Sequence, residues 1–155
     1  MLKKLILFIA LFSSLLFSEG RVIPLSQLYL TPLEIKDKMF HLWLALNPLQ
    51  HTEGLSFVSS DAVPHRYGML FIYPENQERT FWMKDTFLDL DIAFIKESGE
   101  VSDVYSMERD SYEFFSSTEE VRYVLELRRG VFKEIALKAG DKIQLPRVIS
   151  DFSKP

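Results

Sequence analysis

The chain has 155 residues, no cysteine and a formal net charge of −4 at pH 7. This acidic balance argues against nucleic acid as a partner, because proteins that bind it carry clustered positive charge. The absence of cysteine excludes disulfides, thiolate metal sites and catalytic thiols. The length fits one domain, and the 13 phenylalanines suit a β-rich core.

The first 20 residues have the pattern of a signal peptide. Lys3 and Lys4 precede an apolar run over residues 5–17, and the small residues Ser18 and Gly20 follow it. The run is shorter than the roughly 20 residues that span a bilayer. We therefore expect a secreted or periplasmic protein, cleaved between residues 18 and 20. The alternative is an uncleaved anchor, which would be the only membrane contact.

The chain after residue 20 consists of short predicted strands separated by turn residues. Pro24 and Pro32 disfavour helix, so residues 21–37 are expected to form an extended lead-in to the domain. Alternating side chains over residues 39–46 predict the first strand. Thr52 is placed to cap a short helix after it.

Further strands follow, with a predicted hairpin in the middle of the chain. A strand over residues 68–73, a turn over 74–77 and a return strand over 79–84 make up this hairpin. The other predicted elements are strands over 91–96, 100–107, 121–127 and 142–145, a surface loop over 108–120, helical turns over 131–138 and a flexible tail over 148–155. The domain would span residues 38–147. This pattern predicts a mainly β fold, a small antiparallel sandwich or barrel with one or two short helices.

Several ordered sequence blocks carry a resemblance. They are GMLFIYP at residues 68–74, RTFWMKDT at 79–86 and LDLDIAFI at 88–95, with EGL at 53–55 upstream and YVLEL at 123–127, Gly130 and AGD at 139–141 downstream. Together they resemble the family DUF192, also called the UPF0127 proteins, over about residues 38–146. The resemblance implies a β-sandwich or barrel of jelly-roll type. It implies no activity, because the family has no agreed one, and its members often carry signal peptides.

The chain departs from the family pattern at three positions. Ser56 stands where the family has methionine, and Val58 or another neutral residue replaces an arginine that usually follows. Asp85 replaces the asparagine of the family's WMKNT block. If that arginine serves a site in the family, this chain has lost or altered it.

The predicted return strand carries the first candidate site residues. In an extended strand Phe81 and Met83 share one face, and they form the natural core pair. Trp82 and Lys84 then line the opposite face or a groove, where an aromatic ring beside a charge suits a sugar or a polar ligand. The simpler interpretation makes Trp82 a core residue and Lys84 a surface lysine.

Acidic residues supply the remaining candidates. Asp85 ends the strand, where it shapes a turn or contacts a ligand. Asp89 and Asp91 are two apart and share a side of an extended chain, so with Asp85 they are candidates for a calcium or magnesium site. The sequence lacks a dedicated calcium loop, and we expect no metal or other cofactor. Glu126 faces away from its neighbouring leucines, and it could act with Asp91 as an acid–base pair.

The sequence contains no known catalytic signature, and binding is therefore the favoured prediction. We expect a noncatalytic module of the cell envelope that binds a saccharide or another polar small molecule. Its candidate ligand-binding residues are Trp82, Lys84, Asp85, Asp89, Asp91 and Glu126. One alternative is a carboxylate- or metal-dependent hydrolase that uses Asp89, Asp91 and Glu126. Another is a structural or assembly factor that works through its surface.

Overall fold

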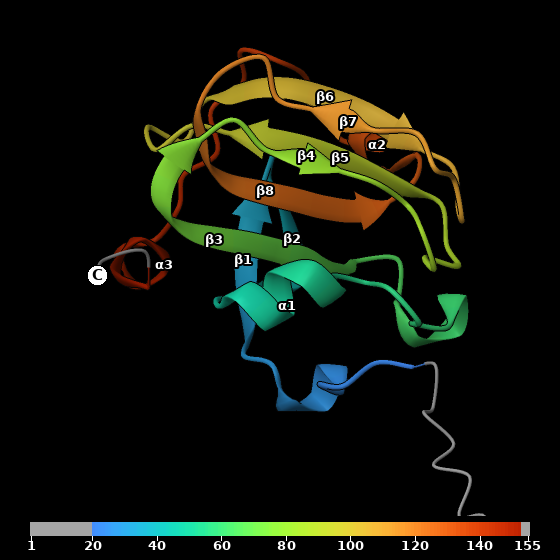
Figure 1. Ribbon diagram of the computed structural model, residues 1–155. Coiled ribbons are helices and arrows are strands. Elements are labelled where there is room, and N and C mark those ends of the chain that lie inside the picture. The colour runs from blue at the N-terminus through green and yellow to red at the C-terminus, as the bar shows by residue number, and fades with distance from the viewer. Residues whose placement is uncertain (1–19, 153–155) are drawn as a thin grey trace, which may run out of the picture.

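A computed structural model describes residues 20–152 of the chain (Figure 1). The predicted signal peptide, apart from Gly20, lies outside the described residues. None of the helices in the described part of the chain combines the length and the hydropathy needed to cross a bilayer.

The centre of the molecule is a six-stranded sheet with the strand order β1-β2-β3-β8-β5-β6. Its strands are β1 (Leu30–Ile35), β2 (Lys38–Ala45), β3 (Tyr67–Gln77), β5 (Leu90–Ile95), β6 (Val101–Met107) and β8 (Val121–Arg128). A second sheet has only two strands, β4 (Thr80–Phe81) and β7 (Phe115–Ser116). The helices are α1 (Pro48–Glu53), α2 (Val131–Glu134) and α3 (Arg147–Asp151), with 3-10 turns η1 (Leu25–Gln27) and η2 (Ser60–Ala62).

The mainly β prediction is confirmed, but two of its details are wrong. Strands β2 and β3 run parallel while the other neighbours in the large sheet are antiparallel, so this sheet is mixed. The order begins at β1 and ends at β6, so the sheet is open and no barrel closes. A parallel pair needs a long crossover connection, and residues 46–66 supply it with α1 and η2.

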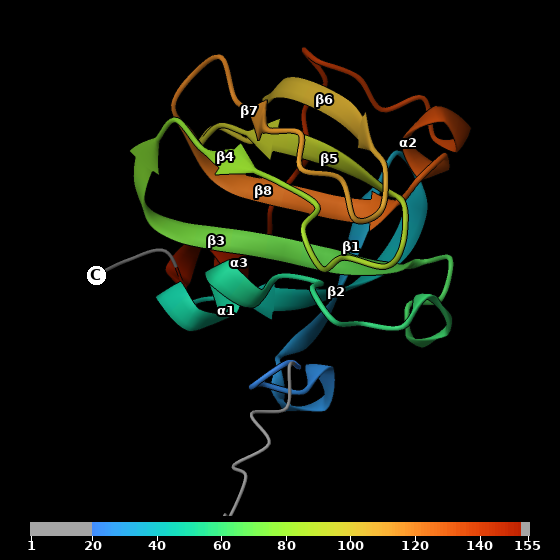
Figure 2. The same cartoon turned by 45° about the vertical axis from the view of Figure 1, so that its right-hand side comes forward.

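The large sheet is covered on both faces, because its central strands are apolar on both sides. All six residues of β5 are buried, as are five consecutive residues of β8, Tyr123–Leu127. One face packs under α2 and the chain that follows it; the other packs under α1, residues 55–63 and the β4–β7 pair. Figure 2 shows α1 beside β3 and the β4–β7 pair in front of β8 and β5. Strands buried on both faces have near-continuous apolar sequences, as β5 has here.

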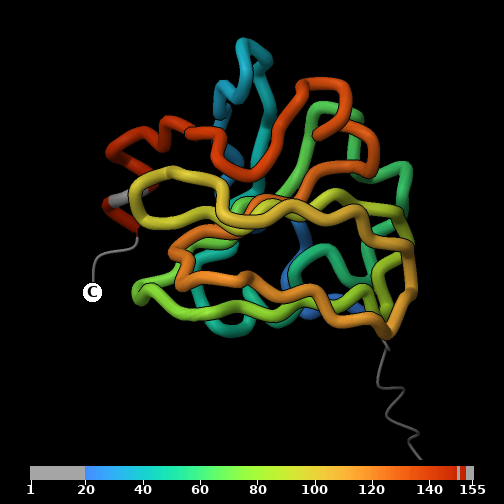
Figure 3. The backbone as a smooth tube through the Cα atoms, turned by 90° about the horizontal axis from the view of Figure 1, so that it is seen from above, coloured from blue at the N-terminus to red at the C-terminus, as the bar shows by residue number. Residues whose placement is uncertain are grey.

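The predicted hairpin of residues 68–73 and 79–84 is wrong. Strand β3 runs on to Gln77, and both of its edges are already occupied, by β2 and β8. The chain after Gln77 therefore leaves the large sheet, and β4 pairs with β7 instead, as Figure 3 shows from above. Edge-to-face contacts of Phe81 with Phe71 and Phe94, at centroid distances of 4.9 and 5.9 Å, hold β4 over the sheet.

Several smaller predictions have mixed outcomes. The predicted strand over residues 39–46 is confirmed as β2. The β5–β6 hairpin, β8 and the helical turns at α2 are also confirmed. Thr52 does not cap α1: Asn47 is the cap and accepts from the Gln50 N–H at 3.0 Å, while Thr52 bonds back to Pro48. The predicted strand over 142–145 is reduced to one bridge between Glu100 and Lys142.

Candidate functional site

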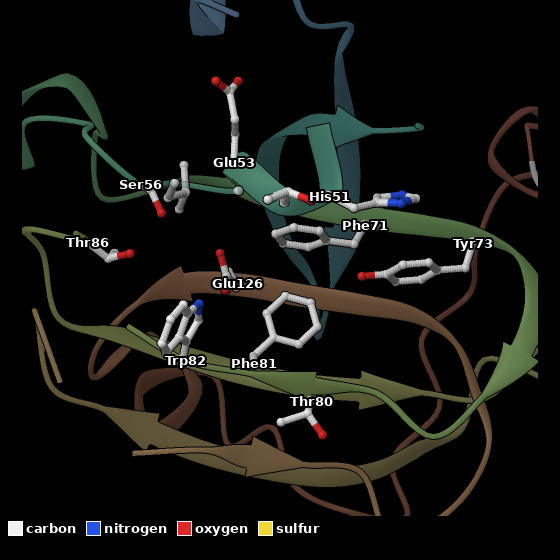
Figure 4. A pocket seen from close by; sticks show the side chains of 13 residues that line it. His51, Glu53, Ser56, Phe71, Tyr73, Thr80, Phe81, Trp82, Thr86 and Glu126 are labelled. Carbon is white, nitrogen blue, oxygen red and sulfur yellow. The ribbon is translucent and has the colours of Figure 1, made fainter. Parts of the chain in front are cut away.

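A pocket of about 280 Å³ lies between the large sheet and its cover of α1 and β4 (Figure 4). We call it the Glu126 pocket, after the residue that rises into it from β8. Its lining comes from α1 and the loop after it, from β3, from β4 with the turn after it, and from β8. The lining residues are His51, Thr52, Glu53, Gly54, Leu55, Ser56, Phe71, Tyr73, Thr80, Phe81, Trp82, Thr86 and Glu126.

Glu126 is a buried acid on one of the two middle strands of the sheet. Its register partners are Met69 on β3 and Ile92 on β5, so apolar side chains flank it on both sides. Only 4% of the residue is exposed, and its carboxyl makes no hydrogen bond or ion pair within the described part of the chain. Burial raises the pKa of Glu126 from its usual 4.5 to about 8, because the charged form loses its hydration. The carboxyl is therefore mostly protonated at neutral pH.

Tyr73 is the second polar group aimed into the pocket. Its ring is buried, and its hydroxyl points into the pocket toward the rings of Phe71 and Phe81 in Figure 4. That hydroxyl bonds to no residue that the structure describes. Burial raises the pKa of Tyr73, so its hydroxyl remains a neutral donor and acceptor. The guanidinium carbon of Arg79 lies 3.7 Å from the centre of the Tyr73 ring and holds the ring in place.

His51 is a structural residue of the pocket wall. Its Nε2 lies 3.0 Å from the carbonyl oxygens of both Ala45 and Ile72, so the imidazole joins α1 to β2 and β3. Its ring also packs on Tyr73, with 4.2 Å between the centroids. Burial lowers the pKa of His51, so the ring is held in its neutral form.

Aromatic rings form most of the apolar wall. Phe71 from β3 and Phe81 from β4 meet edge to face above the sheet. Trp82 closes the mouth with 45% of its surface exposed, and it stacks on Phe114 at 5.8 Å and an interplanar angle of 8°. The Lys84 ammonium lies 5.5 Å from the centre of the Trp82 ring and is not part of the lining.

The rim of the pocket is tied to the start of the domain. Arg21 Nη1 donates to the Gly54 carbonyl at 2.6 Å, and Arg21 Nη2 lies 4.0 Å from the Glu53 carboxylate. The same carboxylate accepts hydrogen bonds from the backbone N–H groups of Val22 and Ile23. These contacts hold the loop after α1 over the pocket, and they pair the Glu53 carboxylate with groups of the protein itself.

Asp85 shapes the turn beside the rim, as the turn hypothesis predicted. Its φ is +57°, in the left-handed region that asparagine and aspartate adopt more readily than most residues. Its carbonyl accepts from the Phe57 N–H at 2.8 Å, which joins this turn to the loop after α1. Replacement of the family's asparagine by aspartate therefore keeps the backbone geometry. The Asp85 side chain does not line the pocket.

Asp89 and Asp91 lie away from the pocket and have structural partners. Asp91 accepts from Ser106 Oγ at 2.6 Å and from the N–H groups of Gly130 and Phe132, so it holds the start of α2. Asp89 accepts from the Arg109 N–H at 2.8 Å. The suggested cluster with Asp85 does not form: in the described chain no three acids or histidines gather as metal ligands.

The suggested pairing of Asp91 with Glu126 is also wrong. On the adjacent strands β5 and β8, Asp91 is opposite Leu127 while Ile92 is opposite Glu126. Directly paired residues share a face, so the two carboxyls project from opposite faces of the sheet. A hydrolytic pair of these two acids therefore has no geometric basis.

Of the six predicted site residues, the structure brings two into the pocket, Trp82 and Glu126. Lys84 adjoins Trp82 from outside the lining, Asp85 supports the rim, and Asp89 and Asp91 lie elsewhere. Tyr73 and His51 were not among the residues predicted from sequence, and Phe81 was predicted as a core residue. The resembling blocks themselves pointed to the pocket, because four of them supply lining residues: Gly54, Tyr73, Trp82 and Glu126.

A family model identifies the family of the chain, and two solved structures are similar to it in fold. The sequence profile of DUF192, described as an uncharacterized ACR, matches residues 31–145. A solved protein of unknown function from Novosphingobium aromaticivorans is similar, with a TM-score of 0.72 and 25% identity over 80% of this chain and 91% of that one. A proposed transcription regulator from Sinorhizobium meliloti has a TM-score of 0.66 and 29% identity over 74% of this chain and 90% of that one. No curated protein matches.

Proposed function

We propose that this chain, which belongs to the DUF192 family, is a noncatalytic binding protein of the cell envelope that holds a polar small molecule or saccharide in the Glu126 pocket. One observation carries the proposal: a buried carboxyl that bonds to no residue in the described part of the chain faces an open pocket with aromatic walls.

The energetics of Glu126 support a ligand. A buried polar group without a hydrogen bond costs roughly 1–3 kcal/mol, and most buried polar groups are therefore paired. Glu126 and the hydroxyl of Tyr73 both face the pocket, and neither bonds to the part of the protein that the structure describes. A bound molecule with polar groups on one edge and an apolar body would satisfy both and pack against Phe71 and Phe81.

The contacts of the lining favour binding over catalysis. His51 Nε2 is engaged by two backbone carbonyls, and the hydroxyls of Ser56 and Thr86 both lie 3.4 Å from the Lys84 carbonyl oxygen. No hydroxyl of the described lining hydrogen-bonds to His51 or Glu126. An activated nucleophile needs an adjacent base, and this lining has no such pair.

DNA is not part of the proposal, although one similar structure is described as a proposed transcription regulator. The net charge of this chain is −4, and the described lining of its pocket has two acids, Glu53 and Glu126, and no lysine or arginine. DNA binding requires a positively charged surface that neutralises phosphates.

The envelope location rests on the N-terminal sequence. Lys3, Lys4 and the apolar run over residues 5–17 have the order of a signal peptide. Cell fractionation followed by immunoblotting tests it: the protein is expected in the periplasm or medium. Recovery from the cytoplasm alone would contradict this part of the proposal.

Ligand binding is tested by tryptophan fluorescence, since the chain has two tryptophans and only Trp82 lines the pocket. A Trp43→Phe variant leaves Trp82 as the sole reporter. Titration with glucose, N-acetylglucosamine and small polar organic molecules is expected to change its emission for at least one compound, and Glu126→Gln is expected to alter that response.

The matched control is Met39→Ala, which changes an exposed side chain on β2 outside the pocket and is expected to leave the titration unchanged. An unchanged Trp82 emission throughout, with no shift in thermal stability for any compound, would refute the binding role.

A further inference from the structure

The described lining of the Glu126 pocket contains acidic side chains and no lysine or arginine. Four ionisable residues line it: His51, Glu53, Tyr73 and Glu126. Glu53 is engaged by Arg21 and by two backbone N–H groups, and His51 is held neutral between two carbonyls. Glu126 is therefore the one lining group that can supply a free charge to a ligand, and that charge is negative.

The nearby cations do not reach into this space. The Arg79 guanidinium lies over the Tyr73 ring, Lys84 lies beside the Trp82 ring, and Arg21 is bound to the rim. None of them lines the pocket. The β-strand neighbours of Glu126, Met69 and Ile92, carry no charge. An anionic ligand would find no lysine or arginine in the described lining to pair with, so the pocket favours a cation over an anion.

The walls of the pocket suit a positive charge. Phe71, Tyr73, Phe81 and Trp82 surround the space above Glu126, and aromatic faces carry negative electrostatic potential that attracts cations. A carboxylate at the base of an aromatic enclosure combines a point charge with these ring faces. Organic ammonium ions are recognised by such combinations, because their N–H groups bond to the carboxylate and their carbon atoms pack against rings.

Resting on the binding role proposed above, we infer that the ligand is a small organic amine whose ammonium group bonds to the Glu126 carboxylate inside the ring of Phe71, Tyr73, Phe81 and Trp82. The cavity of about 280 Å³ admits a molecule with a single ring or a short chain. The Tyr73 hydroxyl serves as a second acceptor for an ammonium N–H. The exposed edge of Trp82 closes over the carbon frame.

Binding of the amine releases one proton from the Glu126 carboxyl to solvent. In the empty pocket the Glu126 carboxyl is mostly protonated at pH 7, because burial raises its pKa to about 8. When the ammonium ion enters, the carboxyl loses its proton to solvent and becomes the carboxylate that pairs with the unchanged ammonium. Affinity therefore increases as pH rises toward 8, and close to one proton is released for each amine bound at pH 7.

Three probes of matched shape test the inference on the full chain: benzylamine, benzyl alcohol and benzoate. Titrations by isothermal calorimetry in phosphate and in MOPS buffer give the affinity and the protons released, and NMR follows the Trp82 indole N–H for weak binding. Benzylamine is expected to bind at least tenfold more tightly than benzyl alcohol and to release protons. Benzoate is expected not to bind.

Variants distinguish a loss of charge recognition at Glu126 from a general loss of binding. Glu126→Gln keeps the side-chain shape and is expected to abolish both the preference for benzylamine and the proton release, while Glu126→Asp is expected to retain a reduced preference. Glu108→Gln, a change at an exposed acid outside the pocket, is expected to bind as the unmodified chain does.

Two negative results have different meanings. If benzyl alcohol or a monosaccharide binds as tightly as benzylamine, or if Glu126→Gln keeps the preference, the amine inference is wrong and the binding role stands. If none of the probes or saccharides shifts the Trp82 signal at millimolar concentration, both are wrong.

Discussion

The burial of Glu126 depends on elements from other parts of the chain. Its side chain lies on the face of β8 opposite Leu125 and Leu127, and α1 and β4 cover that face. The alternation of a strand specifies which way a residue points, and only tertiary packing specifies what covers it.

The buried carboxyl makes stability depend on pH in a defined direction. The folded pKa of Glu126, about 8, lies above its usual 4.5, so the folded state binds the extra proton between these values. The contribution of Glu126 to the free energy of unfolding is therefore largest below pH 4.5. It falls as pH rises to 8, by on the order of 5 kcal/mol at most.

Glu126→Gln is expected to remove this pH-dependent loss. Urea unfolding should show the variant more stable than the unmodified chain at pH 8, with the difference shrinking toward pH 5. The control is Glu108→Gln, where an exposed acid is changed. A stability difference that stays constant over this pH range would show that Glu126 titrates normally.

Gly54 occupies a backbone conformation that most side chains avoid. Its φ is +46° and its ψ is −124°, and a Cβ there would lie 3.2 Å from the ring of Phe71. Gly54→Ala is therefore expected to destabilise the protein by about 1–3 kcal/mol. Thermal unfolding measures it, with Gly140→Ala as comparison, where φ is also positive and the space is open. Equal losses would mean that backbone strain alone acts at Gly54.

At the scale of elements, strands with their own periodicity were predictable and their partners were not. The β5–β6 hairpin follows from two apolar runs around Ser98-Gly99, and the structure confirms it. The same reasoning failed at β3, because Pro74–Gln77 has turn chemistry while the strand continues through it. Strands β2 and β8 pair with the two edges of β3. The sequence near β3 contains no signal that these strands would exclude a hairpin partner.

The β4–β7 pair is held mainly by its contacts with the sheet. Each strand has only two residues, and an isolated pair of this length is unstable in water. Phe81→Ala removes the edge-to-face contacts with Phe71 and Phe94 and is expected to cost about 2 kcal/mol. Denaturant unfolding measures the loss.

Hydrogen exchange gives the more specific signal for the same variant. The backbone amides of Phe81 and Ser117, which lie along this pair, are expected to exchange faster than those of β8. Phe87→Ala removes an exposed ring and serves as the control. Uniform acceleration across all strands would show global destabilisation instead of release of the pair.

At the scale of the whole molecule, the sequence blocks identified the family, the pattern of short strands and turns predicted the mainly β class, and the mixed sheet was visible only in the structure. Four of the blocks that carry the resemblance converge on one pocket, although they are far apart in the chain. Asp89 and Asp91 belong to such a block and yet have structural partners. Membership in a distinctive block therefore did not separate residues that face a ligand from residues that hold the fold.

The proposed export also has a molecular readout. Mass spectrometry of the protein recovered from the periplasm is expected to show a chain that begins between residues 19 and 21, which keeps Arg21 at or near the new terminus beside Glu53. Detection of only the full-length chain in the membrane fraction would support the uncleaved anchor.

The open sheet has a further consequence at the β1 border. The His41 N–H donates to Arg66 on the β3 side, so Pro32, its register partner on β1, has its backbone nitrogen turned away from β2 toward the free edge. Proline has no N–H, and this border therefore lacks a donor at its middle. A strand from another molecule could not form a continuous row of backbone hydrogen bonds with β1 there. Pro32 therefore protects the molecule against edge-to-edge aggregation.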